Sequence, residues 1–298
     1  MEQNLEELVK SYNIRNALEN RNNQNFYHYT SNDAFKSITN TNSILLSNVQ
    51  EMNDKSECCL CFEIIKESVK KKGTVSNKII KAVSDKFYKK LDEVFVFSFS
   101  TEDDDVAQWE RYADNAEGVC LVSSYERVVT WMKRNEIDCD HSSDVKYLEC
   151  NSALNDIPNH WITDYEKIFN QCYAQNTNDV SNYLLDNNLN LLVTFCSLFK
   201  NRTFRSEKEY RIIVINDPIR SKSCNNHTRL IPRKDKPRLE FNNAFLPISQ
   251  LQDNTSYSLF SEVVLGPRSG VDPVVLQDYL RNERGLDVTV SKSNSSLR

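Results

Sequence analysis

The amino-acid sequence predicts an α+β fold: a mixed, mainly antiparallel sheet with flanking helices and a helical insertion at about 155–200. Short segments of alternating or continuous apolar residues recur along the 298-residue chain, as in β-strands, and amphipathic segments separate them irregularly. Only five glycines occur, and neither G-x-G-x-x-G nor the P-loop pattern is present, which argues against Rossmann and P-loop nucleotide enzymes. No flexible linker divides the chain, so we expect one domain over residues 1–298.

The first half of the chain mixes helices and strands. Helices are predicted at 3–19, 32–40, 53–72, 76–91, 104–113 and 126–135. Asn32 or Asp33 lies near the expected N-cap of the second helix, Gly73 joins the third to the fourth, and the first turn of the fifth is acidic. Strands are predicted at 26–30, 43–48, 93–100, 118–124 and 145–150.

The second half contains the helical insertion and the remaining strands. Two helical segments are expected inside the insertion, at 161–175 and 179–200, and a last helix at 271–283. Residues 217–238 read as a polar loop or an edge hairpin. Strands are predicted at 209–216, 238–243, 261–267 and 287–292.

Composition restricts the class of protein. The formal net charge of −5 gives no chain-wide basic footprint for nucleic acid, and the basic run at 229–238 is more typical of a solvated loop. Nine cysteines, an odd number, and an acidic N-terminal segment favour free thiols in the cytoplasm. No apolar run reaches the ~18 residues that a membrane span needs. We therefore expect no membrane partner, and the spacing of Cys58, Cys59 and Cys61 does not predict a metal site.

Polar residues on predicted strands form the candidate site. His28 lies in the strand FYHYTS, and Tyr29 alternates to the opposite face, so at most one of the two points into a given pocket. Trp109 and Tyr112 are spaced i,i+3 on one helical face, and we predict both as ligand-binding residues together with Tyr29 and Thr30, although core packing also explains this spacing. Glu207, Glu209 and Arg211 share one face at period 2. Three charged groups there are costly to bury unless they are paired or bound to a ligand.

Six ordered motifs carry a resemblance to a family. They are HYT at 28–30, NDKSE at 53–57, FSFST at 97–101, WERYADNAEG at 109–118, FRSEKEYR at 204–211 and VLGP at 264–267. The order resembles that of a bacterial family, domain of unknown function 2971, from about 26 to 285. A role in stress or anti-phage defence, as a toxin-like effector, is an expectation from this resemblance alone.

A second resemblance concerns mechanism. A histidine strand, a serine strand followed by a helix, and a glutamate strand occur in an order similar to that of ADP-ribosyltransferases that use NAD, which would give a split sheet. The resemblance implies that His28 binds the nicotinamide-side ribose and that Glu209 is the catalytic glutamate. The strand residues Ser98, Ser100 and Thr101 would hold the nicotinamide together with Tyr112, and Glu207 would be the upstream member of an E-x-E pair. The glycine that usually follows the histidine is replaced by Tyr29 and Thr30.

The predicted reaction is cleavage of the nicotinamide–ribose bond of NAD. Positive charge builds on the sugar as this bond breaks, and a carboxylate stabilises that transition state. The ligand would be a nucleotide-type small molecule, the acceptor a protein or a nucleic acid, and Lys200 a contact for phosphate. Two alternatives stay open: a sensor that binds an anionic ligand without turnover, through Arg211 and Lys200, and a nuclease whose metal is held by carboxylates from Asp54, Glu57, Glu207 and Glu209.

Overall fold

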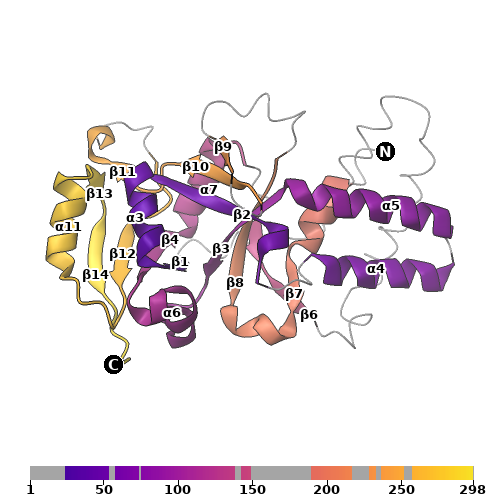
Figure 1. The fold of residues 1–298 in the computed structure, drawn as a ribbon, viewed down its shortest axis with the longest axis horizontal. Helices are drawn as coiled ribbons and strands as arrows, with labels where there is room; N and C mark the ends of the chain where they lie inside the picture. Colours follow the sequence, from indigo (N-terminus) through magenta and orange to yellow (C-terminus); the bar gives the residue numbers. More distant parts are fainter. Residues whose placement is uncertain are drawn as a thin grey trace.

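The computed structural model describes residues 24–53, 58–73, 75–137, 142–148, 189–216, 228–232, 236–251 and 257–297. The main sheet contains β1 (Asn25–Thr30), β2 (Ser43–Asn48), β3 (Val94–Ser100), β4 (Val119–Ser124), β5 (Ser142–Asp144), β8 (Glu209–Ile215), β9 (Thr228–Ile231), β10 (Arg238–Asn242), β12 (Glu262–Leu265) and β14 (Thr289–Lys292). Its order is β14-β12-β4-β1-β3-β2-β10-β9, and β8 joins β3 to β5 (Figure 1). Among the described strands of this sheet, only β12 and β14 pair in parallel. The predicted α+β class is confirmed.

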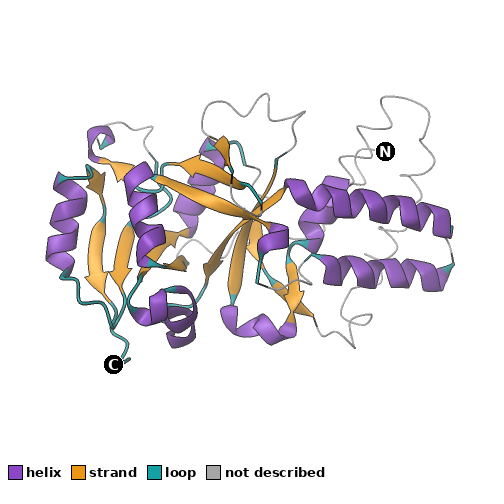
Figure 2. Ribbon diagram, in the orientation of Figure 1, coloured by secondary structure: helices purple, strands orange, loops and turns teal. Residues whose placement is uncertain are grey.

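Helices cover both faces of this sheet, and further helices lie at the two ends of the molecule (Figure 2). They are α3 (Asn32–Thr41), α4 (Cys59–Lys72), α5 (Asn77–Lys90), α6 (Val106–Tyr112), α7 (Tyr125–Arg134) and α11 (Pro273–Asn282). Residues 189–196 are also helical. The antiparallel pair of α4 and α5 lies at one end of the molecule, and α11 at the other (Figure 1). None of the helices in the described ranges is long and apolar enough to cross a membrane.

Strand β3 separates two hydrophobic cores, because its side chains alternate between the faces of the sheet. Phe95, Phe97 and Phe99 point into a core shared with α3, α7 and β8. Val94 and Val96 point into a second core, which α4, α5 and segment 189–196 complete. The apolar character of β3 on both faces, visible in the sequence as VFVF, follows from this central position.

Helix ends refine the sequence prediction. Ser31, rather than Asn32 or Asp33, is the N-cap of α3, and its hydroxyl accepts a hydrogen bond from the amide of Ala34 at 3.1 Å. Asp105 caps α6, whose own first turn contains no acidic residue, so the acids precede the helix. Gly73 ends α4 with φ of 67°, a conformation that glycine adopts without strain.

Several predicted elements are shorter or divided. The strand expected at 145–150 is β6 (Lys146–Leu148), which pairs in parallel with β7 (Phe199–Asn201). The strand expected at 287–292 is divided into β13 (Leu286–Asp287), which pairs with β11 (Leu246–Pro247), and β14. Residues 217–238 do end in a hairpin, formed by β9 and β10. The predicted N-terminal helix 3–19 and most of the insertion, up to residue 188, lie outside the described residues.

The VLGP motif is explained by close backbone packing. A Cβ atom on Gly266 would lie 2.2 Å from the carbonyl oxygen of Ala116, so only glycine fits there. The amide of Gly266 donates to the carbonyl of Gly118 at 2.9 Å, and that of Arg268 donates to Ala116 at 3.0 Å. This contact joins the end of β12 to the turn that precedes β4.

Candidate functional site

The candidate site is a cavity of about 660 Å³ where the sheet divides. Strands β1 and β2 both pair with one edge of β3, but at different places. Tyr27 of β1 is opposite Ser100, whereas Ser47 of β2 is opposite Val96. Between these pairs, Phe97–Phe99 of β3 have no paired residue on β1 or β2 in the described chain, and the cavity lies beside this edge. A volume of this size is typical of small-molecule sites.

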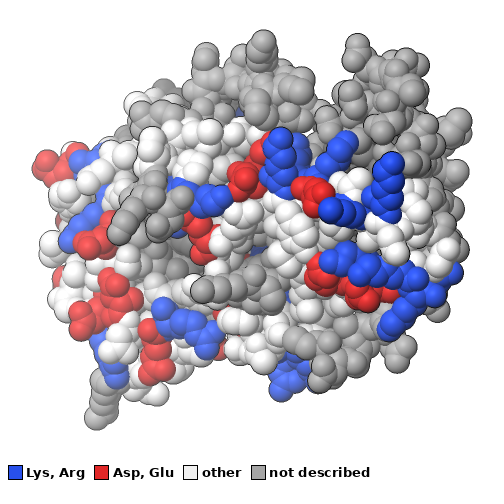
Figure 3. Space-filling view, turned by 45° about the vertical axis from the view of Figure 1, so that its right-hand side comes forward, with Lys and Arg blue, Asp and Glu red and all other residues white. Residues whose placement is uncertain are grey.

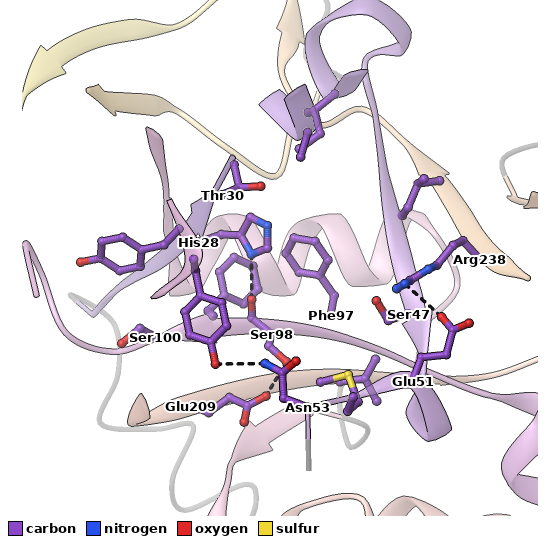
Figure 4. A pocket seen from close by; sticks show the side chains of 18 of the residues that line it. His28, Thr30, Ser47, Glu51, Asn53, Phe97, Ser98, Ser100, Glu209 and Arg238 are labelled. Carbon is purple, nitrogen blue, oxygen red and sulfur yellow. Dashed lines mark hydrogen bonds and ion pairs between the residues drawn. The ribbon is translucent and has the colours of Figure 1, made fainter. Parts of the chain in front are cut away.

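His28 of β1 lies at the wall of this cavity. Its Nδ1 atom is 2.9 Å from the carbonyl oxygen of Ser98, and its ring stacks on Phe97 at 4.4 Å between centroids (Figure 4). A carbonyl oxygen only accepts, so Nδ1 carries the proton and Nε2 keeps a free lone pair. Burial lowers the pKa of His28 to about 4, and the bond to Ser98 only partly opposes this. The imidazole is therefore neutral near pH 7.

Glu209 is held at the start of β8 by four hydrogen bonds. The Nε and NH2 groups of Arg211 donate to its two carboxylate oxygens, at 2.7 and 2.8 Å. The Ser98 hydroxyl donates to Oε1, and Lys200 donates to Oε2 at 3.2 Å. A carboxylate offers about four acceptor positions, so all of those on Glu209 are occupied. Glu209 and Arg211 do share one face of the strand, as the sequence pattern predicts.

Lys200 links the two glutamates of the E-x-E pair. Its ammonium group lies 2.7 Å from Glu207 Oε2, and its side chain is only 3% exposed. Burial works to lower the pKa of Lys200, but Glu209 and Glu207 outweigh it, so the pKa is raised and the amine stays charged. Glu207 lies in the 3-10 helix η5 (Arg202–Glu207), which precedes the strand, instead of in the strand itself. Lys200 therefore holds a position between two carboxylates.

Tyr112 of α6 completes this polar cluster. Its hydroxyl donates to Glu207 Oε1 at 2.7 Å and accepts from the side-chain amide of Asn53 at 3.3 Å. Burial, followed by the Glu207 carboxylate, raises the pKa of Tyr112 above its usual value. Arg111 approaches the same carboxylate at 3.3 Å from the solvent side. Helix α6 thus brings a phenol and a guanidinium to Glu207.

Burial also raises the pKa of Glu209, while Lys200 and the Ser98 hydroxyl lower it. Arg211 is fully buried and donates in addition to the carbonyl of Ser197 at 2.7 Å. The two cationic partners favour the charged form of this buried carboxylate and so oppose the effect of burial. The two glutamates then balance Lys200 and Arg211, which reduces the cost of burying these four charges.

Among the other predicted ligand residues, Ser100 and Thr30 line the cavity and Trp109 does not. Ser100 donates to the backbone carbonyl of Glu207 at 3.1 Å, and thereby fixes η5 against β3. Trp109 is completely buried and donates to Asp104 at 2.7 Å. The Tyr29 side chain packs edge-to-face on this indole at 4.9 Å.

Tyr29 and His28 therefore point to opposite faces of β1, in agreement with the alternation expected from the sequence. The hydroxyl of Tyr29 donates to the carbonyl of Glu102 at 3.0 Å and accepts from the amide of Asp105 at 3.0 Å. Both bonds hold the loop before α6. Trp109 supports the site from behind, while Tyr29 is among the residues that line the cavity although its ring packs on Trp109.

The opposite wall of the cavity was missed by sequence reasoning. Arg238 of β10 forms an ion pair with Glu51 at 3.0 Å, and Ser47 of β2 lies beside them (Figure 4). Glu240, also on β10, accepts from Ser43 at 2.9 Å. Arg238 had been assigned to a solvated basic loop, but the pairing of β10 with β2 brings it to the cavity. The cavity has a polar group at each end, with aromatic residues between them.

The described residues contain no group of three or more His, Cys, Asp or Glu side chains that could hold a metal ion. Glu207 and Glu209, two of the four carboxylates expected for a nuclease, are bound to Lys200 and to neighbouring donors instead. Asp54 and Glu57, the other two, lie outside the described residues.

Comparison with known proteins finds a match to one family over part of the chain, and that family has no described activity. Residues 108–212 match the family described as "Protein of unknown function (DUF2971)". This confirms the family resemblance for the segment that contains Tyr112, Lys200, Glu207, Glu209 and Arg211. No curated protein and no solved structure matches the chain. The similarity to ADP-ribosyltransferases stays a prediction.

Proposed function

We propose that the cavity binds a nucleotide-type ligand and cleaves the nicotinamide–ribose bond of NAD, as an ADP-ribosyltransferase or NAD glycohydrolase. One observation carries the proposal: the same cavity is lined by His28, Tyr112 and Glu209. The first and the last of these residues are 181 positions apart in the sequence. The three come from β1, α6 and β8. The reaction requires this convergence, because one ribose must meet its positioning and charge-stabilising groups together.

Each group has a chemical task in this proposal. The neutral His28 offers Nε2 as an acceptor for a ribose hydroxyl, because Nδ1–H is already bonded to Ser98. The Glu209 carboxylate stabilises the positive charge that develops on the sugar. Nicotinamide leaves as a neutral molecule once the bonding electrons move to its ring nitrogen, so a general acid is not needed. The acceptor, water or a macromolecule, then attacks the sugar carbon.

Glu209 must exchange one of its present hydrogen bonds to reach a ligand. Arg211 is fully buried behind it, so its two bonds are the fixed ones. The Ser98 hydroxyl can rotate, and the Lys200 contact at 3.2 Å is the longest of the four. Ligand binding is expected to displace one of these two donors.

The hydrogen bonds that already fill the acceptor positions of Glu209 favour a second candidate, a sensor that binds its ligand without turnover. A carboxylate whose acceptor positions are all filled is also what a structural ion-pair network shows. The sensor would use the cavity and its second polar group, Glu51 with Arg238, but no bond of the ligand would break. A nuclease has less support, because Lys200 neutralises both glutamates.

The test measures nicotinamide release from NAD by the purified protein, with and without cell lysate as a source of acceptors. Glu209→Gln and His28→Gln should each lower the rate about 100-fold or more, because they remove transition-state stabilisation and ribose positioning. Glu67→Gln, at an exposed position of α4, is the matched control and should keep the full rate. Melting temperatures establish that each variant is folded.

Binding of NAD, measured by calorimetry, separates the two candidates. Binding with release that depends on Glu209 supports the enzyme. Binding without release supports the sensor. No binding and no release in either sample would overturn both.

A further inference from the structure

The helical hairpin of α4 and α5 has a charge opposite to that of the rest of the chain. These two helices contain nine lysines and three acidic residues, a net charge of +6, whereas the whole chain carries −5. The remaining residues therefore carry −11 together. Side chains coloured as Lys or Arg gather on the right-hand part of the space-filling view, where the hairpin comes forward (Figure 3).

The lysines point outward because the apolar faces of both helices are used in the core. Phe62 of α4 stacks on Phe87 of α5 at 3.8 Å between centroids, and Ile65 and Ile80 pack in the same core. On α5, the lysines occupy the face opposite to these apolar positions, at Lys78, Lys81, Lys86 and Lys89, all exposed. A helix of 14 residues extends over about 21 Å, so the row is long enough to follow several phosphates.

Much of this charge is not neutralised by neighbours. Lys66 pairs with Glu63, and Lys70 pairs with Glu67 at 2.9 Å. Within the part of the chain that the structure describes, no ion pair involves Lys78, Lys81 or Lys89. The hairpin therefore presents a positive surface to solvent.

We propose that the outer face of the α4–α5 hairpin binds the phosphate backbone of a nucleic acid, without reading its sequence. Lysine is a point charge on a flexible chain and contacts phosphates well, but it carries little base specificity. This surface is separate from the cavity, so the inference does not depend on the reaction that the cavity performs.

Two other partners fit the surface less well. An amphipathic helix binds a membrane by inserting its apolar face, but here Phe62, Ile65 and Phe87 are already buried inside the protein. A protein partner needs apolar or aromatic anchors at the centre of its interface. Among the exposed large hydrophobic residues of the described chain, Tyr88 is the one on this hairpin, and its hydroxyl is bonded to Glu63.

The test measures fluorescence anisotropy of labelled duplex DNA, single-stranded DNA and single-stranded RNA of 30 nucleotides with the full chain. With about four phosphate contacts on the duplex, raising the salt from about 50 to 200 mM should weaken binding about 100-fold. A triple variant, Lys78→Gln with Lys81→Gln and Lys89→Gln, should lower the slope of log K against log salt by about 2 to 3. Asp85→Asn, which removes one negative charge from the same face, should tighten binding.

The matched control removes three exposed positive charges elsewhere, by Lys36→Gln, Lys133→Gln and Arg281→Gln. It should change affinity less than about threefold at about 150 mM salt, since these charges lie outside the hairpin and salt screens distant charges. Glu209→Gln should bind nucleic acid as the wild type does, whether or not the cavity is catalytic. Equal losses in both triple variants, or no binding to any of the three nucleic acids at about 50 mM salt, would overturn the proposal. So would tighter binding to vesicles of anionic lipid or to polyglutamate.

Discussion

At the scale of single residues, the site is governed by how buried charges are paired. Glu209 and Arg211 form a bidentate pair, the geometry in which a guanidinium matches a carboxylate best. The sequence pattern E-x-E-Y-R placed these two side chains on one face of a strand. It could not show that Lys200 would lie between the two glutamates, because that contact depends on how η5 folds back from β7.

The first prediction concerns this pair. Glu209→Leu should lower the free energy of unfolding by about 3–5 kcal/mol, because it leaves the buried Arg211 without its partner. Adding Arg211→Met should recover part of the loss, since the double variant has no unpaired guanidinium. Urea denaturation of the two single variants and the double variant provides the cycle. A double variant that loses the sum of the two single effects would contradict the coupling.

The second prediction concerns the pH dependence that His28 introduces. Its pKa is about 4 in the folded protein and about 6.5 when unfolded, so below pH 6.5 the unfolded chain takes up a proton that the folded protein does not. The contribution of His28 to the free energy of unfolding is therefore fully present above pH 6.5. It decreases by about 3 kcal/mol as the pH is lowered to 4. His28→Gln keeps a donor for the Ser98 carbonyl and does not titrate. Chemical denaturation at pH 7 and pH 4 should show a smaller drop for the variant, and equal drops would refute the burial of the imidazole.

At the scale of elements, strand periodicity was predictable but strand pairing was not. The alternation in FYHYTS and VFVFSFS predicted β1 and β3 nearly residue by residue. The division of the sheet depends on where β1 and β2 leave β3, and this offset is set by tertiary packing. The two explanations for Trp109, ligand contact and core packing, stayed open for a similar reason. Trp109 and Tyr112 are one helical turn apart, and the sequence does not show which of them faces the cavity.

The third prediction concerns how the C-terminal segment supports α6. The Asp104 carboxylate accepts from Trp109 Nε1 at 2.7 Å, from the Ser293 hydroxyl at 2.5 Å and from the Asn294 amide at 2.9 Å. Removing residues 293–298 deletes two of these bonds, each with a net contribution of about 0.5–1.5 kcal/mol. Amide hydrogens in α6 should then exchange about 10-fold faster, while those in α7 keep their rates. Hydrogen exchange with mass spectrometry measures both helices, and an equal change in the two would mean that the segment stabilises the fold only in general.

At the scale of the whole molecule, β3 and β8 connect the two cores. Each of these strands packs one of its faces into the first core and the other face into the second core. The main contacts of β3 with β8 run from Val94–Ile215 to Ser100–Glu209, the full length of both strands. If either core opened alone, these two strands would lose the packing on one side while keeping it on the other. We therefore expect the cores to unfold together, as one domain would.

The fourth prediction tests this cooperativity. Leu121→Ala in the first core and Ile65→Ala in the second should each lower the free energy of unfolding by about 2–5 kcal/mol. Both side chains are completely buried, so the two substitutions are matched in burial and in the kind of cavity they create. A single transition should shift to lower temperature in both variants, with calorimetric and van't Hoff enthalpies in agreement. Two transitions, of which each variant moves only one, would mean that the cores are independent; the cavity between β1 and β2 would then lie at a boundary that can open.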